Sequence, residues 1–255
     1  MLTEKRYDMI LRLLNEKRSV TVTELTEHLN ASESTIRRDL NALDQAGKLV
    51  KVFGGAVAME MSLLSEEPSV EQKMDVNMDQ KRLIARFAAT LIEAGDFIYL
   101  DAGTTTGLMI EFINEKNITI VTNAVDHAKR LAMRGIRVLL IGGELKNTTE
   151  AIVGNQAILN IQSYHFNKGF FGTNGASKKE GFTTPDYNEA LVKKTALEAC
   201  YKKYILCDSE KLDKVSSVTF APIDVGTILT EQVPKGLLEK SKNYIVVDKL
   251  LRTLS

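Results

Sequence analysis

The sequence predicts an α/β protein built from two domains. The chain has 255 residues, of which 44% are hydrophobic and 26% charged, so it can form one large or two smaller hydrophobic cores. Its first part holds short apolar patterns with helical spacing, whereas its second part alternates short apolar runs with helical stretches. We therefore expect a small, mainly helical domain over 1–58, a linker over 59–78 and a mainly parallel α/β domain over 79–255.

The first domain is expected to begin with two helices and a turn. Thr3 is placed to cap a helix whose apolar side chains recur on one face. A second short helix is predicted over Glu24–Leu29, with Thr23 as its cap. The turn Asn30-Ala31 then leads to Ser32, a good cap for a third helix. This spacing is typical of a helix-turn-helix.

The third helix has two chemically different faces. Ile36, Leu40 and Leu43 recur at i, i+4 and i+7, so they form an apolar stripe that must be buried. The opposite face carries Ser34, Arg37, Arg38 and Asn41. Arginine suits guanine edges or phosphates, and asparagine suits an adenine edge, so this face can read a DNA groove. For an isolated helix the alternative is an ordinary solvated face, but the flanking sequence favours DNA binding.

A β-hairpin is expected after this helix. Gly47 ends the helix, the segment Lys48–Phe53 alternates like a half-buried strand, and Gly54-Gly55 offers a hairpin turn. This pattern predicts a wing beside the recognition helix. Lys48 and Lys51 would then lie over DNA phosphates, a contact that positions the protein without reading sequence.

These motifs together resemble the winged helix-turn-helix of DeoR-family bacterial transcriptional regulators. The resemblance rests on Thr35-Ile-Arg-Arg-Asp-Leu40, then Gly47-Lys-Leu-Val50, then Gly54-Gly-Ala56, and it covers the whole N-terminal module. It implies that Thr35, Arg37 and Arg38 lie at the operator. Many members carry Arg at the position of Lys51. Lysine keeps the positive charge there but weakens a bidentate contact.

Periodicity is lost between Ala58 and Met78, where Pro68 prevents one continuous helix. We interpret this segment as a linker. A helix then opens at Asp79 or Gln80 and ends at Gly95.

Each of the next apolar runs should form a strand of one sheet. The runs cover 97–100, 118–121, 138–141, 169–171, 204–207, 226–229 and 244–247. In an open parallel sheet the carboxyl ends of the strands line one crevice, so the segments that follow them should converge. Small and polar residues follow the first five runs, at Asp101–Gly107, Thr122-Asn123, Gly142-Gly143, Gly172–Gly175 and Asp208–Lys211.

The segment Gly103–Gly107 has the composition of a phosphate cradle. Glycine lets a ligand approach the backbone, threonine hydroxyls donate, and a helix N-terminus adds free N–H groups. A Thr-rich turn is the alternative for this loop alone, and the other polar strand ends favour a small anionic ligand. The loop is neither a Walker motif nor a dinucleotide fingerprint, so nucleotide binding is not supported.

The region Gln80–Thr230 resembles the effector-binding domain of the same family, whose fold is related to ribose-5-phosphate isomerase and which typically senses phosphorylated sugars. Gly143–Lys146 and Gly181–Asp186 look most like regulators of fructose or lactose/galactitol phosphotransferase operons. Two motifs depart from the family pattern. Asp208-Ser-Glu-Lys-Leu212 replaces Asp-x-Ser/Thr-Lys-Phe, which alters the sugar fit near Lys211, and Thr230-Glu231 replaces Thr-Asp at a peripheral position. The expected effector-binding residues are Asp101, Gly103, Thr104, Thr105, Thr106, Asn123, Gly142, Gly143, Gly172, Asn174, Gly175, Glu189, Lys193, Asp208 and Lys211.

The composition gives no sign of a bulk basic charge, a metal site, a membrane span or a signal peptide. The formal net charge is zero, and residues 1–58 carry nine lysines and arginines against eight acids, so DNA binding depends on where the charges lie. Cys200 and Cys207 lack CxxC spacing and are expected to be buried thiols, and the three histidines show no metal-ligand pattern. No apolar run reaches the roughly 18 residues of a membrane span, and no signal-peptide core is present. We expect a cytoplasmic protein with neither metal nor cofactor.

The sequence thus favours a repressor of a sugar uptake and catabolism operon, controlled by a phosphorylated ketohexose such as fructose 1-phosphate or tagatose 6-phosphate. Its partners would be operator DNA and a second copy of the chain, as a dimer or tetramer. One alternative is an isomerase with an added DNA-binding module, in which Glu189, Asp208, Lys193 or Lys211 serves as the general base or as the group that stabilises the enediolate. A helix-turn-helix used only for protein contacts is disfavoured by the outward Arg37/Arg38 face.

Overall fold

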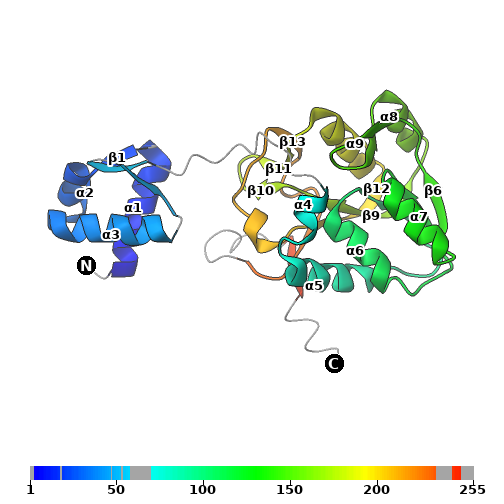
Figure 1. The fold of residues 1–255 in the computed structure, drawn as a ribbon, viewed down its shortest axis with the longest axis horizontal. Helices are drawn as coiled ribbons and strands as arrows, with labels where there is room; N and C mark the ends of the chain where they lie inside the picture. Colours follow the sequence, from blue (N-terminus) through cyan, green and yellow to red (C-terminus); the bar gives the residue numbers. More distant parts are fainter. Residues whose placement is uncertain are drawn as a thin grey trace. The chain divides into compact units, whose positions relative to one another are not determined.

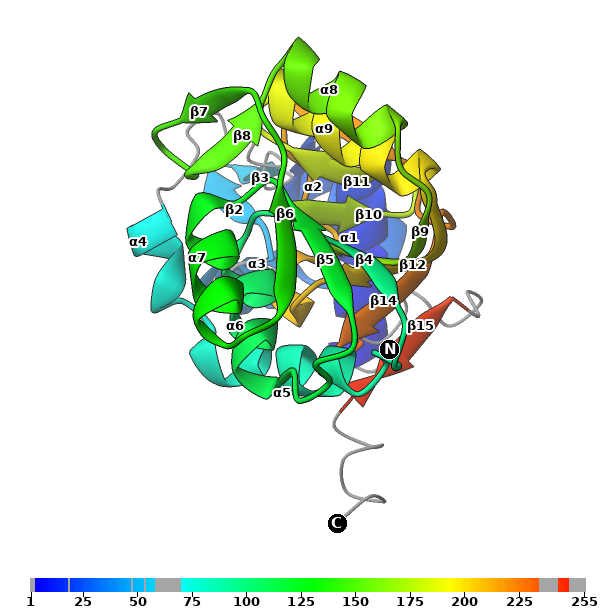
Figure 2. The same cartoon turned by 90° about the vertical axis from the view of Figure 1, so that its right-hand side faces the viewer.

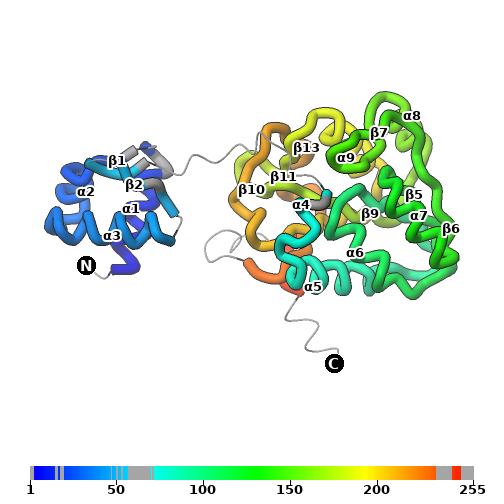
Figure 3. Tube along the Cα trace, in the orientation of Figure 1, coloured from blue at the N-terminus to red at the C-terminus, as the bar shows by residue number. Residues whose placement is uncertain are grey.

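The computed structural model describes residues 3–17, 19–46, 48–52, 54–57, 70–233 and 243–247. The chain divides into two compact units, Met1–Leu63 and Leu64–Ser255. Figure 1 shows the elements of each unit and Figure 3 traces the chain through them.

The N-terminal unit is a winged helix-turn-helix, as predicted. It contains α1 (Thr3–Lys17), β1 (Ser19–Thr21), α2 (Val22–Leu29), α3 (Glu33–Gln45), β2 (Val50–Val52) and β3 (Gly55–Val57). The strands form an antiparallel sheet in the order β1-β3-β2, so the predicted hairpin β2–β3 gains an additional strand, β1, that the sequence pattern did not indicate.

The helix caps explain where α2 and α3 begin. Thr21, rather than the predicted Thr23, caps α2, because Glu24 lies three residues after it and completes a capping box. Thr21 Oγ1 accepts from the Glu24 amide at 3.1 Å, and the Glu24 carboxylate accepts from the Thr21 amide at 2.8 Å. Ser32 caps α3 as predicted. Gly47, the predicted end of α3, lies outside the described residues.

A buried ion pair fixes α3 against α1. Arg6 of α1 is 7% exposed and Asp39 of α3 is 1% exposed. Arg6 Nη2 donates to Asp39 Oδ1 at 3.0 Å and Arg6 Nε donates to the second carboxylate oxygen. This hydrogen bonding raises the pKa of Arg6. The apolar core of this unit includes Ile36, Leu40 and Leu43, the predicted inner stripe of α3.

The second unit contains a seven-stranded parallel sheet, and each strand lies on a predicted apolar run. The strand order is β15 (Tyr244–Val246), β14 (Thr227–Thr230), β12 (Cys200–Leu206), β9 (Phe166–Gly172), β4 (Phe97–Leu100), β5 (Thr119–Thr122) and β6 (Arg137–Leu140). All the pairings are parallel, which confirms the predicted architecture.

Helices cover both faces of this sheet (Figure 2). Ile98 and Leu100 face a core shared with α5, α6 and α7, whereas Tyr99 faces a core shared with α8 and α9, as the alternation of a strand requires. Further antiparallel strands pack outside the main sheet. The helices are α5 (Met78–Ala89), α6 (Thr104–Phe112), α7 (Val125–Met133), α8 (Asn155–Gln162) and α9 (Tyr187–Glu198), and the outer strands are β7 (Glu144–Lys146), β8 (Ala151–Val153), β10 (Gly175–Ser177), β11 (Gly181–Thr184) and β13 (Val218–Ala221).

The strand order reverses next to β4. The chain passes from β4 outward through β5 to β6, then returns to the other side of β4 as β9 and continues through β12 to β14 and β15. A crevice forms at the carboxyl ends of two neighbouring parallel strands when the connections that follow them run in opposite directions. The segments that follow β4, β9 and β12 meet at this crevice.

The predicted linker is wrong over its last part. A helix, α4 (Val70–Met74), lies within it, and residues 70–78 belong to the second unit. A five-residue helix is too short to produce a periodic apolar pattern, so no sequence signal marked it. The segment 58–69 lies outside the described residues.

Two further expectations concern thiols and membranes. Cys200 and Cys207 are buried, as predicted, and burial raises the pKa of each thiol to about 12. Among the described helices, none is long and apolar enough to span a membrane.

We predict that Asp39→Ala destabilises the N-terminal unit by about 3–5 kcal/mol, because it leaves the Arg6 guanidinium buried without its carboxylate. Glu33→Gln is the matched control on the same helix, since Glu33 pairs with Arg37 at the surface and such pairs contribute about 0–1 kcal/mol. Hydrogen exchange of α3 amides in the full chain measures both effects. Equal loss of protection in the two variants would contradict the prediction.

Candidate functional site

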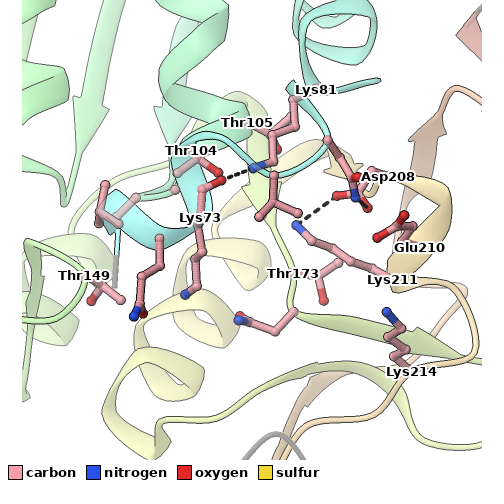
Figure 4. Close-up of a pocket in the computed structure, with 18 of the residues that line it drawn as sticks. Lys73, Lys81, Thr104, Thr105, Thr149, Thr173, Asp208, Glu210, Lys211 and Lys214 are labelled. Atoms are coloured by element: carbon pink, nitrogen blue, oxygen red, sulfur yellow. Dashed lines mark hydrogen bonds and ion pairs between the residues drawn. The ribbon is translucent and has the colours of Figure 1, made fainter. Parts of the chain in front are cut away.

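A cavity of about 360 Å³ lies at the crevice beside β4 and β9. Figure 4 shows its side chains converging from loops after three strands and from α4, α5 and the β7–β8 hairpin. Its lining residues are Val70, Gln72, Lys73, Val76, Asn77, Lys81, Ala102, Gly103, Thr104, Thr105, Thr149, Gly172, Thr173, Asn174, Glu189, Lys193, Asp208, Glu210, Lys211 and Lys214.

The N-terminus of α6 forms one wall of the cavity. Gly103, Thr104 and Thr105 line it, and the first turn of a helix leaves backbone N–H groups without intrahelical acceptors. A side chain at Gly107 would place a Cβ 2.7 Å from His127 Nε2, so glycine there allows α7 to pack against this turn. The wall therefore has the donors of an anion site, held by close helix packing.

A buried carboxylate joins the strand ends behind the cavity. Asp101 follows β4 and is 1% exposed, and its Oδ2 accepts from Lys193 Nζ of α9 and from the Gly172 amide at 3.0 Å. Burial raises the pKa of Asp101, while the Lys193 ammonium opposes that shift. Asp101 thus fixes a cavity-lining lysine.

The β7–β8 hairpin is fastened to α9 through Glu189. The Glu189 carboxylate accepts from Lys146 Nζ at 3.2 Å and from Thr149 Oγ1. These bonds bring Thr149 to the cavity wall, which is visible in Figure 4.

The opposite wall follows β12. Lys211 Nζ lies 3.2 Å from Asp208 Oδ2, and Asn77 Nδ2 donates to Asp208 Oδ1 at 3.3 Å. Glu210 and Lys214 line the same end of the cavity.

Lys81 is a cavity cation that was not predicted from the sequence. It lies on α5, is 3% exposed, and donates from Nζ to the backbone carbonyl of Lys73. Burial, aided by the Lys211 charge, lowers the pKa of Lys81 to about 8. A signal was present, because Lys81 shares the inner face of α5 with the buried residues Ile84, Ala85 and Ala88 at i+3, i+4 and i+7.

The outer face of α3 has the predicted chemistry. Ser34, Arg37, Arg38 and Asn41 are exposed, and Thr35 is half-buried. The Arg37 guanidinium donates from Nε to Glu33 at 3.0 Å. In the wing, the exposed Lys51 side chain donates to Asn41 Oδ1 at 2.6 Å, and Lys48 is also exposed.

Both units match known protein families. Residues 76–232 match the family described as "DeoR C terminal sensor domain", and residues 6–62 match "DeoR-like helix-turn-helix domain". The chain belongs to the DeoR family. It is a DNA-binding transcriptional regulator with a sensor domain.

Full-length relatives agree with this assignment. The chain is 43% identical over 248 residues to "Uncharacterized HTH-type transcriptional regulator FruR" of Bacillus subtilis, covering 97% of this chain and 98% of that protein. It is 34% identical to the "Lactose phosphotransferase system repressor" of Streptococcus mutans (96% and 98% covered) and 36% to that of Staphylococcus epidermidis (95% and 97%). Among solved structures, ribose 5-phosphate isomerase A of Methanocaldococcus jannaschii matches at 16% identity with a TM-score of 0.41, covering 54% of this chain and 56% of that one. That likeness is too remote to bear on activity.

The cavity of this DeoR-family protein is lined by nine of the fifteen residues that are expected to bind the effector. They are Gly103, Thr104, Thr105, Gly172, Asn174, Glu189, Lys193, Asp208 and Lys211.

The other six do not line the cavity. Asp101 and Thr106 are buried behind its wall, and Thr106 Oγ1 donates to the Gly103 carbonyl at 2.9 Å. Asn123 follows β5, on the far side of β4, and its Oδ1 accepts from the Ala102 amide at 2.8 Å. The remaining three have structural roles in turns and sheet packing: Gly142, whose amide donates to Asn160 at 2.9 Å, Gly143, which lies against Val153, and Gly175, which packs on Lys214.

We predict that the Lys81 ammonium loses its proton near pH 8 in the folded protein. The pKa of Lys81 is higher in the unfolded chain, so between about pH 8 and 10.5 the side chain is protonated in the unfolded chain and neutral in the folded protein. The contribution of Lys81 to stability therefore rises with pH across that window. NMR titration of the lysine side chains measures the midpoint, and Lys81→Met identifies the signal. A Lys81 midpoint at the ordinary value of 10.5 would contradict the prediction.

Proposed function

We propose that this DeoR-family protein represses an operon for uptake and catabolism of a sugar, and that a phosphorylated sugar in the sensor cavity controls its DNA binding. The observation that carries the proposal is the cavity itself, which is lined by a helix N-terminus and by several lysines. Relatives named as lactose phosphotransferase system repressors support the choice of a sugar operon.

The phosphate would bind at Gly103–Thr105, where N–H groups and hydroxyls can donate to it. The sugar hydroxyls would lie near Asn174, Asp208 and Lys211, which supply both donors and acceptors. A ketohexose phosphate such as fructose 1-phosphate or tagatose 6-phosphate fits this arrangement. The free sugar would bind far more weakly, because charge-assisted hydrogen bonds would be lost.

The helix α3 would lie in the DNA major groove. Arg37 and Arg38 would contact bases there, with Ser34, Thr35 and Asn41 beside them, and Lys48 and Lys51 would contact phosphates. The surface pair Arg37–Glu33 is exposed and therefore costs little to exchange for a DNA contact. One helix makes a small interface, so a homo-oligomer on paired half-sites would multiply the affinity.

A binding role for the cavity is favoured over isomerisation, because the two acids named for the isomerase alternative, Asp208 and Glu189, are engaged in ion pairs. Asp208 pairs with Lys211, and Glu189 pairs with Lys146. A general base would have to leave its cation before accepting a proton. We therefore assign the cavity to sensing in a cytoplasmic regulator, and steady turnover of a sugar phosphate would overturn this.

We predict that Arg38→Ala or Arg37→Ala costs about 1–3 kcal/mol of operator affinity where the residue reads a base. Lys51→Ala should weaken binding to all sequences alike, because it removes a phosphate contact. Titrations with operator and scrambled DNA at fixed salt measure both effects. Arg137→Ala, an exposed arginine on β6, is the control. Unchanged operator binding in both α3 variants would exclude α3 as the reading helix.

We predict that a ketohexose phosphate changes operator affinity and that Thr105→Ala and Lys211→Ala weaken this response, since both residues line the cavity. A coupling of about 1–3 kcal/mol is typical of such regulation. Operator titrations with and without each sugar phosphate measure it, with Lys129→Ala on the surface of α7 as control. A parent protein that ignores every sugar phosphate would refute the sensing model.

A further inference from the structure

The segment 70–77, which we call the strap, closes one side of the cavity. It consists of α4 and the turn before α5, and Val70, Gln72, Lys73, Val76 and Asn77 all line the cavity. It is also the first part of the second unit that the structure describes after the N-terminal unit. We propose that effector phosphate, bound between Lys81 and the N-terminus of α6, locks the strap onto the sensor and so transmits binding toward the DNA-binding unit. This proposal rests on the function proposed above.

Polar contacts to three other walls of the cavity hold the strap. The Val70 amide donates to the Thr148 carbonyl at 3.1 Å in the β7–β8 loop, and Asn77 donates to Asp208. In the middle, the Lys73 carbonyl accepts from Lys81. The strap is therefore bonded to the hairpin wall, to α5 and to the wall after β12, all of which a ligand in the cavity would also touch.

Apolar packing contributes little to holding the strap. Met74 is 49% exposed and Val76 is 52% exposed. Segments with few buried apolar contacts have low local stability, so a small gain in interaction energy changes their docking. The turn at Asn77 has φ +54°, a backbone conformation that asparagine tolerates better than most residues. Docking of the strap thus depends on the polar groups around the cavity.

Like charges crowd the place where the strap docks. Lys73, Lys81, Lys211 and Lys214 line this part of the cavity, against the carboxylates of Asp208 and Glu210. Lys81, Thr104 and Thr105 all line the cavity (Figure 4), and Lys81 Nζ donates to the Lys73 backbone carbonyl. A phosphate dianion in the cavity would be attracted to the ammonium groups of both the strap and α5. The ligand would then join the strap to α5 and α6.

The chain lacks tryptophan, so one introduced indole reports on the strap alone. Met74→Trp places the reporter on the strap, and Tyr201→Trp, at a side chain that is 86% exposed on β12, is the matched control. We titrate each full-length variant with fructose 1-phosphate and with tagatose 6-phosphate, and follow binding independently by calorimetry. The expected result is a saturable change in emission from the Met74→Trp protein only, at the midpoint that calorimetry gives. Binding without any change in the emission of that variant would overturn the strap proposal and leave the sensing function intact.

Substitutions at Lys81 test the lock. Lys81→Met in the Met74→Trp protein should weaken binding at least about tenfold, because it removes a charged donor. At saturating ligand it should show neither the emission change nor an altered operator affinity, and Lys81→Arg should restore both. A Lys81→Met protein that retains the full response would overturn the proposal. If neither sugar phosphate binds the parent by calorimetry, the proposed sensing function fails and the strap proposal fails with it.

Discussion

The sensor cavity depends on the carboxylate of Asp101. Its Oδ2 accepts from the Gly172 amide and from the Lys193 ammonium, so one group joins the ends of β4 and β9 to α9. Both side chains are buried, and removing either would leave the other as an uncompensated buried charge. The crevice created by the reversed strand order is thereby given a fixed shape and a fixed lysine, although Asp101 does not itself line the cavity.

Apolar runs predicted every strand of the main sheet, but they could not predict the order of the strands. Without the order, the ends of β5 and β6 were expected to join those of β4, β9 and β12. The chain instead places β5 and β6 on the far side of β4, and Asn123 serves there as a brace for Ala102. The local sequence determines which residues form a strand, whereas the packing of the whole domain determines which strands lie next to one another.

The strap and Lys81 escaped prediction for a different reason. The apolar pattern is weak in α4, which has five residues and is held by backbone and side-chain polar contacts. Lys81 was overlooked because a lysine within a helical pattern is usually a solvated residue, and only its alignment with Ile84, Ala85 and Ala88 marks it as inward-facing. Polar contacts between distant segments leave no periodic pattern, so the part of the cavity that the strap builds could not be predicted from the sequence.

The helix-turn-helix and the cavity belong to different units of the chain. In α3 the buried pair with Arg6 fixes the inner face, while on the outer face Arg37 pairs with Glu33 at the surface and Arg38 is exposed, so both are accessible for the proposed DNA contact. Among the described residues, the cavity is lined by the second unit alone. The proposed control of DNA binding would therefore act on how α3 is positioned rather than on the side chains of its outer face. Such control would pass through the strap, the first described part of the second unit after the N-terminal unit, or through an interface between copies of the chain.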